Sequence, residues 1–205
     1  MNKTILVIVG VLLLGGATFF LFKKDMPEIT NYPPIPGPIV AMGDSLVYGY
    51  GATAGNDFVS LLSESIGQPI INMGVNGNTT AGGLSAADMV IELKPSVVLV
   101  LLGGNDYLRG VSIAETFSNL ELIVEKLQAN GAVVILLGIQ GGVLSDPFAA
   151  EFKALAERRG TAYVPNVLSG LIGNQSLMAD AIHPNDAGYA RIAKKVLPVL
   201  EGVLK

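Results

Sequence analysis

Residues 96–106 read SVVLVLLGGND, an unbroken apolar run from Val97 to Leu102 that ends in two glycines, Asn105 and Asp106. A run of β-branched residues and leucines without polar alternation is typical of a strand buried on both faces, as in parallel sheets. The glycines mark the point where the strand gives way to a loop. This stretch therefore predicts an internal strand of a parallel sheet, with Asn105 just beyond its carboxyl end.

Four other short apolar runs predict strands, over residues 38–42, 69–73, 132–139 and 161–164. Apolar residues at helical spacing predict helices between and after these strands, over residues 57–66, 80–93, 112–130, 147–159 and 186–200. Strands that alternate with helices give a mainly parallel sheet covered by helices on both faces. We therefore predict one α/β domain over residues 39–205, whose sites lie beyond the carboxyl ends of its five strands.

The composition of the 205-residue chain excludes several kinds of site. Its net charge is −4, its isoelectric point is about 5.0 and its basic residues are scattered, which argues against a nucleic-acid partner. The chain has no cysteine, so disulfides, thiol catalysis and thiolate metal sites are excluded. Its single histidine, His183, cannot form a multi-histidine zinc site. We expect neither a metal nor another cofactor.

Residues 1–24 form a separate segment. No charge falls between Ile5 and Phe22, and lysines stand on both sides of this run. About 18 helical residues at ~1.5 Å each reach roughly 27 Å, close to the hydrocarbon thickness of a bilayer. We therefore predict one N-terminal transmembrane helix, with the lipid bilayer as a partner through residues 5–22. The alternative is a cleaved signal peptide with its cleavage region at Gly15-Gly16-Ala17, although the apolar run continues past that point.

Residues 25–38, DMPEITNYPPIPGP, carry five prolines and little periodicity. Proline fixes φ and favours an extended chain. This segment is therefore predicted to be a semi-rigid linker that holds the domain away from the anchor.

Serine, histidine and aspartate, the parts needed for acyl transfer, occur at the predicted edge of the sheet. Ser45 follows the first strand, and Asp180 stands three residues before His183. An imidazole can take the serine proton, while a carboxylate on its other nitrogen fixes the tautomer. Asn105 and glycine amides can donate hydrogen bonds to the oxyanion that forms. Each residue also has a plain structural interpretation, in which Ser45 is a turn residue and Asp180 caps local amides.

Three other polar residues near these positions have structural interpretations. Asp44 and Asp106 are predicted to be turn or cap residues. Asn72 is predicted to bond to backbone and not to substrate.

Four short blocks carry a resemblance to a known family: Gly43-Asp44-Ser45-Leu46, Asn72-Met73-Gly74, Gly103-Gly104-Asn105-Asp106 and Asp180-Ala181-Ile182-His183-Pro184. In order and spacing they resemble the blocks of the SGNH (GDSL-type) hydrolases, and most closely the bacterial thioesterase I/arylesterase branch. The resemblance covers nearly all of residues 39–200. It implies a flavodoxin-like three-layer α/β/α sandwich.

The same resemblance implies roles for individual residues. Ser45 would be the nucleophile, His183 the base and Asp180 the acid that orients it. The oxyanion hole would consist of the Ser45 amide, the Gly74 amide and the Asn105 side chain. The chain departs from that branch at Asn78 and at Gln140-Gly141-Gly142, and both positions are expected on the rim where substrate binds.

The sequence thus predicts a membrane-anchored serine hydrolase that cleaves carboxylic esters or thioesters through an acyl-enzyme. It would act as an esterase, acyl thioesterase or lysophospholipase-like enzyme on small acyl substrates. Its domain is expected in the periplasm or at the cell surface, by analogy with exported relatives. Two alternatives stay open: a carbohydrate O-acetyl esterase of the same fold, and a non-enzymatic doubly wound binding module. The glycine-rich run over residues 49–55 lacks the G-x-G-x-x-G spacing and a Walker lysine, which argues against a phosphate cradle.

Overall fold

The computed structural model describes residues 28–140 and 147–205. Five strands form one sheet in the order β2-β1-β3-β4-β5, and every pair of neighbours is parallel. The strands are β1 (Ile39–Gly43), β2 (Ile70–Gly74), β3 (Val97–Leu101), β4 (Val133–Leu137) and β5 (Ala162–Val164). The prediction of a five-stranded parallel sheet is confirmed. The strand order reverses direction between β1 and β3, and crevices for ligands form at such points.

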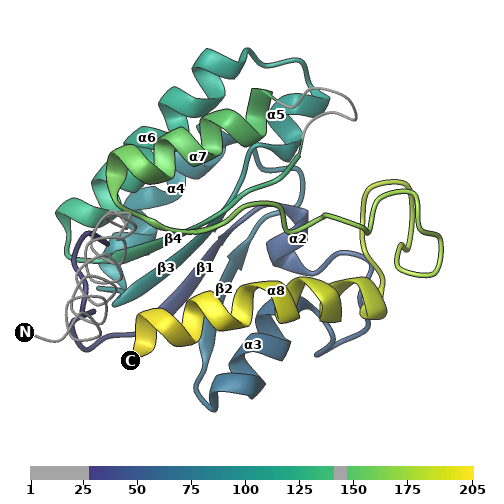
Figure 1. The fold of residues 1–205 in the computed structure, drawn as a ribbon, viewed down its shortest axis with the longest axis horizontal. Coiled ribbons are helices and arrows are strands. Elements are labelled where there is room, and N and C mark those ends of the chain that lie inside the picture. The colour runs from purple at the N-terminus through teal and green to yellow at the C-terminus, as the bar shows by residue number, and fades with distance from the viewer. Residues whose placement is uncertain (1–27, 141–146) are drawn as a thin grey trace, which may run out of the picture.

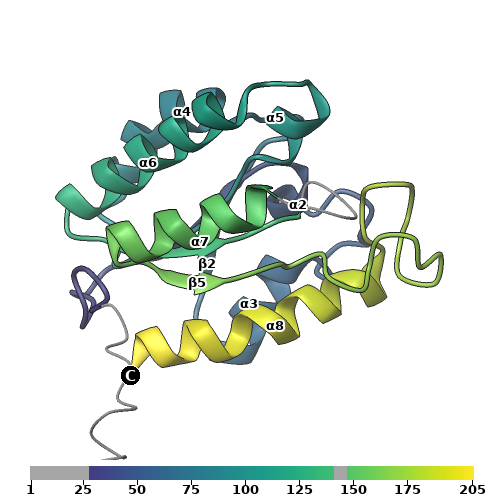
Figure 2. The same cartoon turned by 45° about the horizontal axis from the view of Figure 1, so that its top comes forward.

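Helices cover both faces of the sheet and complete three layers (Figures 1 and 2). The long helices are α3 (Phe58–Ile66), α4 (Thr80–Glu92), α6 (Ile113–Ala129), α7 (Pro147–Arg159) and α8 (Asp186–Leu204). Helices α4, α6 and α7 lie on one face, while α3 and α8 pack together on the other. This arrangement follows from the right-handed crossovers that parallel strands require.

The core consists of the strands and the inner faces of the helices. Strands β1, β3 and β4 are buried at every residue, as their unbroken apolar sequences predict. Strand β2 is partly exposed, because it forms an edge of the sheet. The central strands are therefore fixed on both sides, and the loops at their carboxyl ends start from rigid positions.

Two one-turn helices follow central strands where the sequence analysis expected only loops. Helix α2 (Ser45–Tyr48) comes directly after β1, and α5 (Gly104–Leu108) comes directly after β3. Both are too short for a periodic apolar pattern to reveal them. Both lie at the carboxyl edge of the sheet, where the candidate residues are found (Figure 1).

The described part of the proline-rich segment packs against the domain, a contact that the prediction of a semi-rigid linker over residues 25–38 did not include. We call residues 29–38 the N-terminal clasp. The Thr30 hydroxyl donates to the carbonyl of Arg159 at 3.0 Å. The Asn31 side chain donates to the carbonyl of Gln128 at 2.8 Å.

These contacts have a common cause. The last carbonyls of a helix have no partner within the helix, and the clasp supplies donors to the ends of α6 and α7. At its far end the carbonyl of Pro38 accepts from the Ser96 amide at 2.9 Å, which joins the clasp to the start of β3. The clasp therefore lies at the amino-terminal ends of the strands (Figure 1).

The predicted membrane helix over residues 5–22 lies outside the described residues. Within residues 28–140 and 147–205, no helix is long and apolar enough to cross a membrane.

Candidate active site

Ser45 is held at the end of β1 by a sharp strand-to-helix turn. A Cβ at Gly43 would overlap the Leu101 carbonyl of the neighbouring strand, so only glycine fits at the end of β1. Asp44 caps α2, because its Oδ1 accepts from the Leu46 amide at 2.9 Å. Gly49, with φ of 88°, ends the helix after one turn. Ser45 is thus the first residue of a short helix that is fixed at both ends.

His183 is held by the loop that precedes α8. Asp180 Oδ1 accepts from the amides of Ile182 at 2.9 Å and His183 at 2.8 Å, which closes a tight turn. Asn185 caps α8 by accepting from the Gly188 amide at 3.1 Å. The four residues from Asp180 to His183 therefore form a rigid unit just before a long core helix.

The fold brings these two loops into contact. His183 Nε2 lies 3.0 Å from Ser45 Oγ, and His183 Nδ1 lies 2.7 Å from Asp180 Oδ2. Proton transfer from a hydroxyl to an imidazole needs separations of roughly 2.6–3.2 Å. The arrangement can therefore remove a proton from Ser45 while Asp180 keeps the imidazole in one tautomer.

The charge on Asp180 is strongly favoured. The pKa of Asp180 is lowered to about 2, first by the hydrogen bond from the Ile182 amide and then by that from the His183 side chain. A carboxylate that stays ionised can stabilise an imidazolium across the neutral pH range.

Asn105 reaches the same edge from α5. Its Nδ2 donates to the Asn78 carbonyl at 3.0 Å, which uses one of the two donors of the amide. Arg109, at the end of α5, donates to the Gly77 carbonyl at 2.8 Å. The loop after β2 thus contacts α5 through Gly77 and Asn78.

Gly74 is not brought to the same place. Its amide donates to the Asn72 side chain at 2.9 Å, so it is already engaged. A Cβ at Gly74 would overlap the backbone of Val47 and Tyr48, and this close packing on α2 explains the glycine. Asn72 also donates to the Val47 carbonyl at 2.7 Å, so the expectation that Asn72 bonds to backbone is confirmed. The oxyanion role predicted for the Gly74 amide does not fit this geometry.

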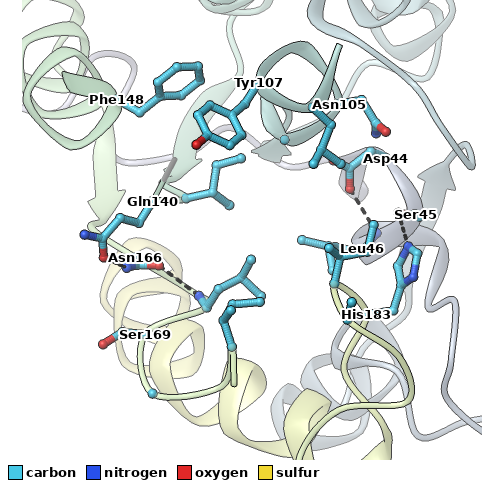
Figure 3. A pocket seen from close by; sticks show the side chains of 18 residues that line it. Asp44, Ser45, Leu46, Asn105, Tyr107, Gln140, Phe148, Asn166, Ser169 and His183 are labelled. Atoms are coloured by element: carbon cyan, nitrogen blue, oxygen red, sulfur yellow. Dashed lines mark hydrogen bonds between the residues drawn. The ribbon is translucent and has the colours of Figure 1, made fainter. Parts of the chain in front are cut away.

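A cavity of about 530 Å³ opens beside Ser45 and His183. Figure 3 shows Ser45, Leu46 and His183 on one side of it, and Gln140, Asn166 and Ser169 on the opposite side. Tyr107 and Phe148 stand along a third side, with their rings 5.7 Å apart and nearly perpendicular. The apolar residues that line the cavity include Leu46, Tyr107, Leu108, Ile139, Phe148 and Leu168. Gly74 is not among the lining residues; it borders a smaller cavity of about 130 Å³.

The donor set of the site does not resemble a metal centre. Within the described ranges there is no cluster of three or more His, Asp or Glu side chains that could hold an ion.

Comparison with known proteins identifies the family. The model of the GDSL-like lipase/acylhydrolase family matches residues 41–191, which include the serine, the histidine and both aspartates of the site. This chain is a member of that family.

Two curated relatives share its sequence over most of their length. Esterase TesA of Pseudomonas aeruginosa is 35% identical over 178 residues, which cover 81% of this chain and 89% of TesA. Thioesterase 1/protease 1/lysophospholipase L1 of Escherichia coli K12 is 29% identical over 156 residues, covering 72% and 75% of the two chains.

A solved structure gives the same result. The psychrotrophic esterase EstA from Pseudoalteromonas, in a structure inhibited by monoethylphosphonate, aligns with a TM-score of 0.74 at 27% identity. The alignment covers 82% of this chain and 99% of that one. This GDSL-like acylhydrolase therefore has the α/β fold of SGNH hydrolases and is an ester-hydrolysing enzyme. The alternative of a non-enzymatic binding module is wrong.

Asp44 of this acylhydrolase site is more than the cap residue that its sequence position predicts. It caps α2 as predicted, but it is also 97% buried beside Ser45, since only 3% of it is exposed. Burial raises the pKa of Asp44 to about 6, against the opposing effects of the Leu46 amide and the His183 charge. This shift could not be read from the sequence, because it depends on how deeply the fold buries Asp44.

Asp44→Asn is expected to stabilise the protein at neutral pH. Below pH 3.8 the carboxyl is protonated in both states, whereas above about pH 6 the folded protein must hold a buried charge. Asparagine keeps an acceptor for the Leu46 amide and removes that charge. We compare the free energy of unfolding in urea of Asp44→Asn with that of wild type at two pH values. The gain in stability of the variant over wild type should be about 1–3 kcal/mol larger at pH 8 than at pH 4. An equal change at both pH values would contradict a buried, ionised Asp44.

Proposed function

We propose that this enzyme cleaves carboxylic esters or thioesters by a two-step acyl transfer through Ser45. The observation that carries the proposal is the chain of contacts from Ser45 Oγ to His183 Nε2 at 3.0 Å and from His183 Nδ1 to Asp180 Oδ2 at 2.7 Å. With its proton on Nδ1 donated to Asp180, the imidazole presents a lone pair on Nε2 to the serine hydroxyl.

In the first step Ser45 Oγ attacks the acyl carbonyl while its proton passes to His183 Nε2. The tetrahedral intermediate collapses, the imidazolium returns that proton to the leaving alcohol or thiol, and the acyl group stays on Ser45. In the second step water attacks the acyl carbonyl and gives its proton to His183. Serine then leaves, takes the proton back and releases the carboxylic acid.

Two donors are suited to the oxyanion of each intermediate. Ser45 is the first residue of α2, so its amide has no acceptor within the helix. The Asn105 side chain has a second Nδ2 hydrogen beyond the one it donates to Asn78. A third donor at Gly74 would require its amide to leave the Asn72 side chain.

The cavity supports an apolar acyl or aryl group as part of the substrate. Its walls beside Ser45 are mainly aliphatic and aromatic, with Tyr107 and Phe148 prominent among them (Figure 3). Burial of each methylene in such a site contributes about 0.8 kcal/mol to binding. This apolar side favours acyl esters and thioesters, whereas the hydroxyls of an acetylated sugar would have to bond to the polar side formed by Gln140, Asn166 and Ser169.

Covalent labelling tests the proposal. An alkyl fluorophosphonate should add one phosphonyl group to the full chain, and peptide mapping should locate it on Ser45. Intact mass after brief incubation with esters of increasing chain length should then report the trapped acyl group. Acylation at a different residue, or labelling that persists in Ser45→Ala, would refute the assignment.

Asn105→Ala is expected to lower kcat for a short-chain nitrophenyl ester by about 10²–10³-fold, with a small change in KM, because the donor acts on the transition state. Asn119→Ala is the matched control, since Asn119 donates to Thr80 and does not line the cavity. Steady-state kinetics of the two variants would check this. A fall in kcat/KM that came only from KM would assign Asn105 to substrate binding instead.

The uncharged run over residues 5–22 supports a further part of the proposal, that the enzyme is anchored in a membrane with its domain outside the cytoplasm. The full chain should stay with membranes after a carbonate wash, and a chain starting at residue 25 should be released. External protease should digest the domain in cells whose outer membrane or cell wall has been permeabilised. Recovery of the full chain in the soluble fraction at its unprocessed mass would contradict the anchor.

A further inference from the structure

Tyr50 contacts the imidazole of His183. The two ring centroids are 4.5 Å apart and the ring planes are tilted by 49°. Tyr50 lies in the glycine-rich run after α2, which the sequence analysis did not connect with catalysis. Ser45, Asp180 and Tyr50 all contact the histidine, and of these Tyr50 has no part in the acyl-transfer scheme.

The backbone of Tyr50 is tied to the nucleophile and to the core. Its amide donates to the Ser45 carbonyl at 3.0 Å. Its carbonyl accepts from the hydroxyl of Tyr189, a fully buried residue of α8, at 2.8 Å. These bonds link Tyr50 to the helix that carries Ser45 and to the helix that follows His183.

The next residue brings the Tyr50 loop against the histidine loop. Gly51 has φ of 92°, and a Cβ there would lie 2.7 Å from the Pro184 carbonyl. Such an approach is open only to glycine. The Tyr50 ring is therefore presented to His183 by a backbone packed directly on the histidine loop.

We propose that Tyr50 is a positioning residue whose ring holds the His183 imidazole and stabilises the imidazolium formed in each acyl-transfer step. This inference rests on the proposed function of Ser45 and His183. A cation within about 6 Å of an aromatic centroid is attracted by the negative face of the ring. The attraction is gained only when the imidazole takes a proton, so it favours the transition state over the resting enzyme.

Two carboxylates also act on His183, Asp180 from its own loop and Asp44 from the start of α2. They stabilise the same positive charge as Tyr50. A test of Tyr50 must therefore leave both carboxylates in place, and substitutions at position 50 do so.

The test compares Tyr50→Phe with Tyr50→Leu. Phenylalanine keeps the ring, so its kcat for a short-chain nitrophenyl ester should stay within about 2-fold of wild type. Leucine removes the ring, so kcat should fall about 5- to 30-fold, with KM nearly unchanged. Because the free imidazolium also loses stabilisation, the acid limb of the kcat/KM profile should move to lower pH by about 0.5–1.5 units.

The combination of a lower plateau and an acid limb shifted to lower pH separates this role from a structural one. A loosened loop would lower the plateau without that shift, which would overturn the proposal. Equal kcat values for the Leu and Phe variants would also overturn it. Tyr50 is 48% exposed, so neither variant opens the core, and thermal unfolding would check this.

Two further variants complete the design. Tyr48→Leu is the matched control, since Tyr48 lies two residues earlier and is 56% exposed. We expect wild-type kinetics for this variant. Ser45→Ala separates the two proposals. If Ser45→Ala is inactive and Tyr50→Leu equals wild type, only the Tyr50 role fails. If Ser45→Ala keeps full activity, the proposed acyl-enzyme function fails, and the Tyr50 role fails together with it.

Discussion

Ser45→Ala is expected to lower kcat/KM for a chromogenic short-chain ester by at least about 10⁴-fold. The variant removes the protein atom that bonds to the acyl group, so no acyl-enzyme can form. Some hydrolysis above the rate in water should remain, because the oxyanion donors and the cavity still bind the substrate.

The matched control for this variant is Ser85→Ala. Ser85 is an exposed residue of α4 whose hydroxyl donates to the Ala81 carbonyl, far along the chain from the site. Both variants should unfold at the same temperature as wild type, and only Ser45→Ala should lose activity and phosphonate labelling. Full hydrolysis by Ser45→Ala would end the case for a serine acyl-enzyme.

Asp180→Asn should lower kcat by up to about 10⁴-fold while leaving the fold intact. Asparagine can still accept from the Ile182 and His183 amides through its oxygen, so the turn is kept. The amide nitrogen would then face His183 Nδ1, now as a donor. The imidazole must place its proton on Nε2, and it can no longer accept one from Ser45.

Asp88→Asn provides the comparison for that change. Asp88 forms an exposed ion pair with Lys126 at 2.7 Å, and such pairs contribute about 0–1 kcal/mol to stability. Its kcat should equal that of wild type. Steady-state kinetics over a pH series would check both variants, and nearly normal turnover by Asp180→Asn would mean that Asp180 only shapes the loop.

The parallel sheet of this fold and the helices on both of its faces could be anticipated from the sequence, because its strands are continuous apolar runs. Runs such as Val97–Leu101 contain no polar residue, and turn residues separate them from the helices. The contact of Ser45 with His183 could also be expected. Ser45 follows β1 and His183 lies in the segment after β5, and parallel strands have their carboxyl ends at one edge of the sheet.

The positions that could not be anticipated depend on contacts between distant segments. Gly74 seemed free to donate to substrate, but its amide bonds to Asn72 and its lack of a side chain serves packing on α2. Tyr50 stands in a glycine-rich run whose sequence indicates no role, although tertiary contacts fix it against the histidine loop. The proline-rich segment suggested an extended spacer, because local sequence cannot reveal that Thr30 and Asn31 meet the open ends of two helices.

The N-terminal clasp also sets the orientation of a domain that is tethered at residue 28. The clasp is fastened at the amino-terminal edge of the sheet, whereas the cavity opens at the carboxyl edge (Figure 1). A tether joined directly to residue 28 would therefore attach on the side of the domain opposite the cavity. An immobilised enzyme of this design would receive its substrates from the surrounding solution, with the mouth of the cavity unobstructed by its own support.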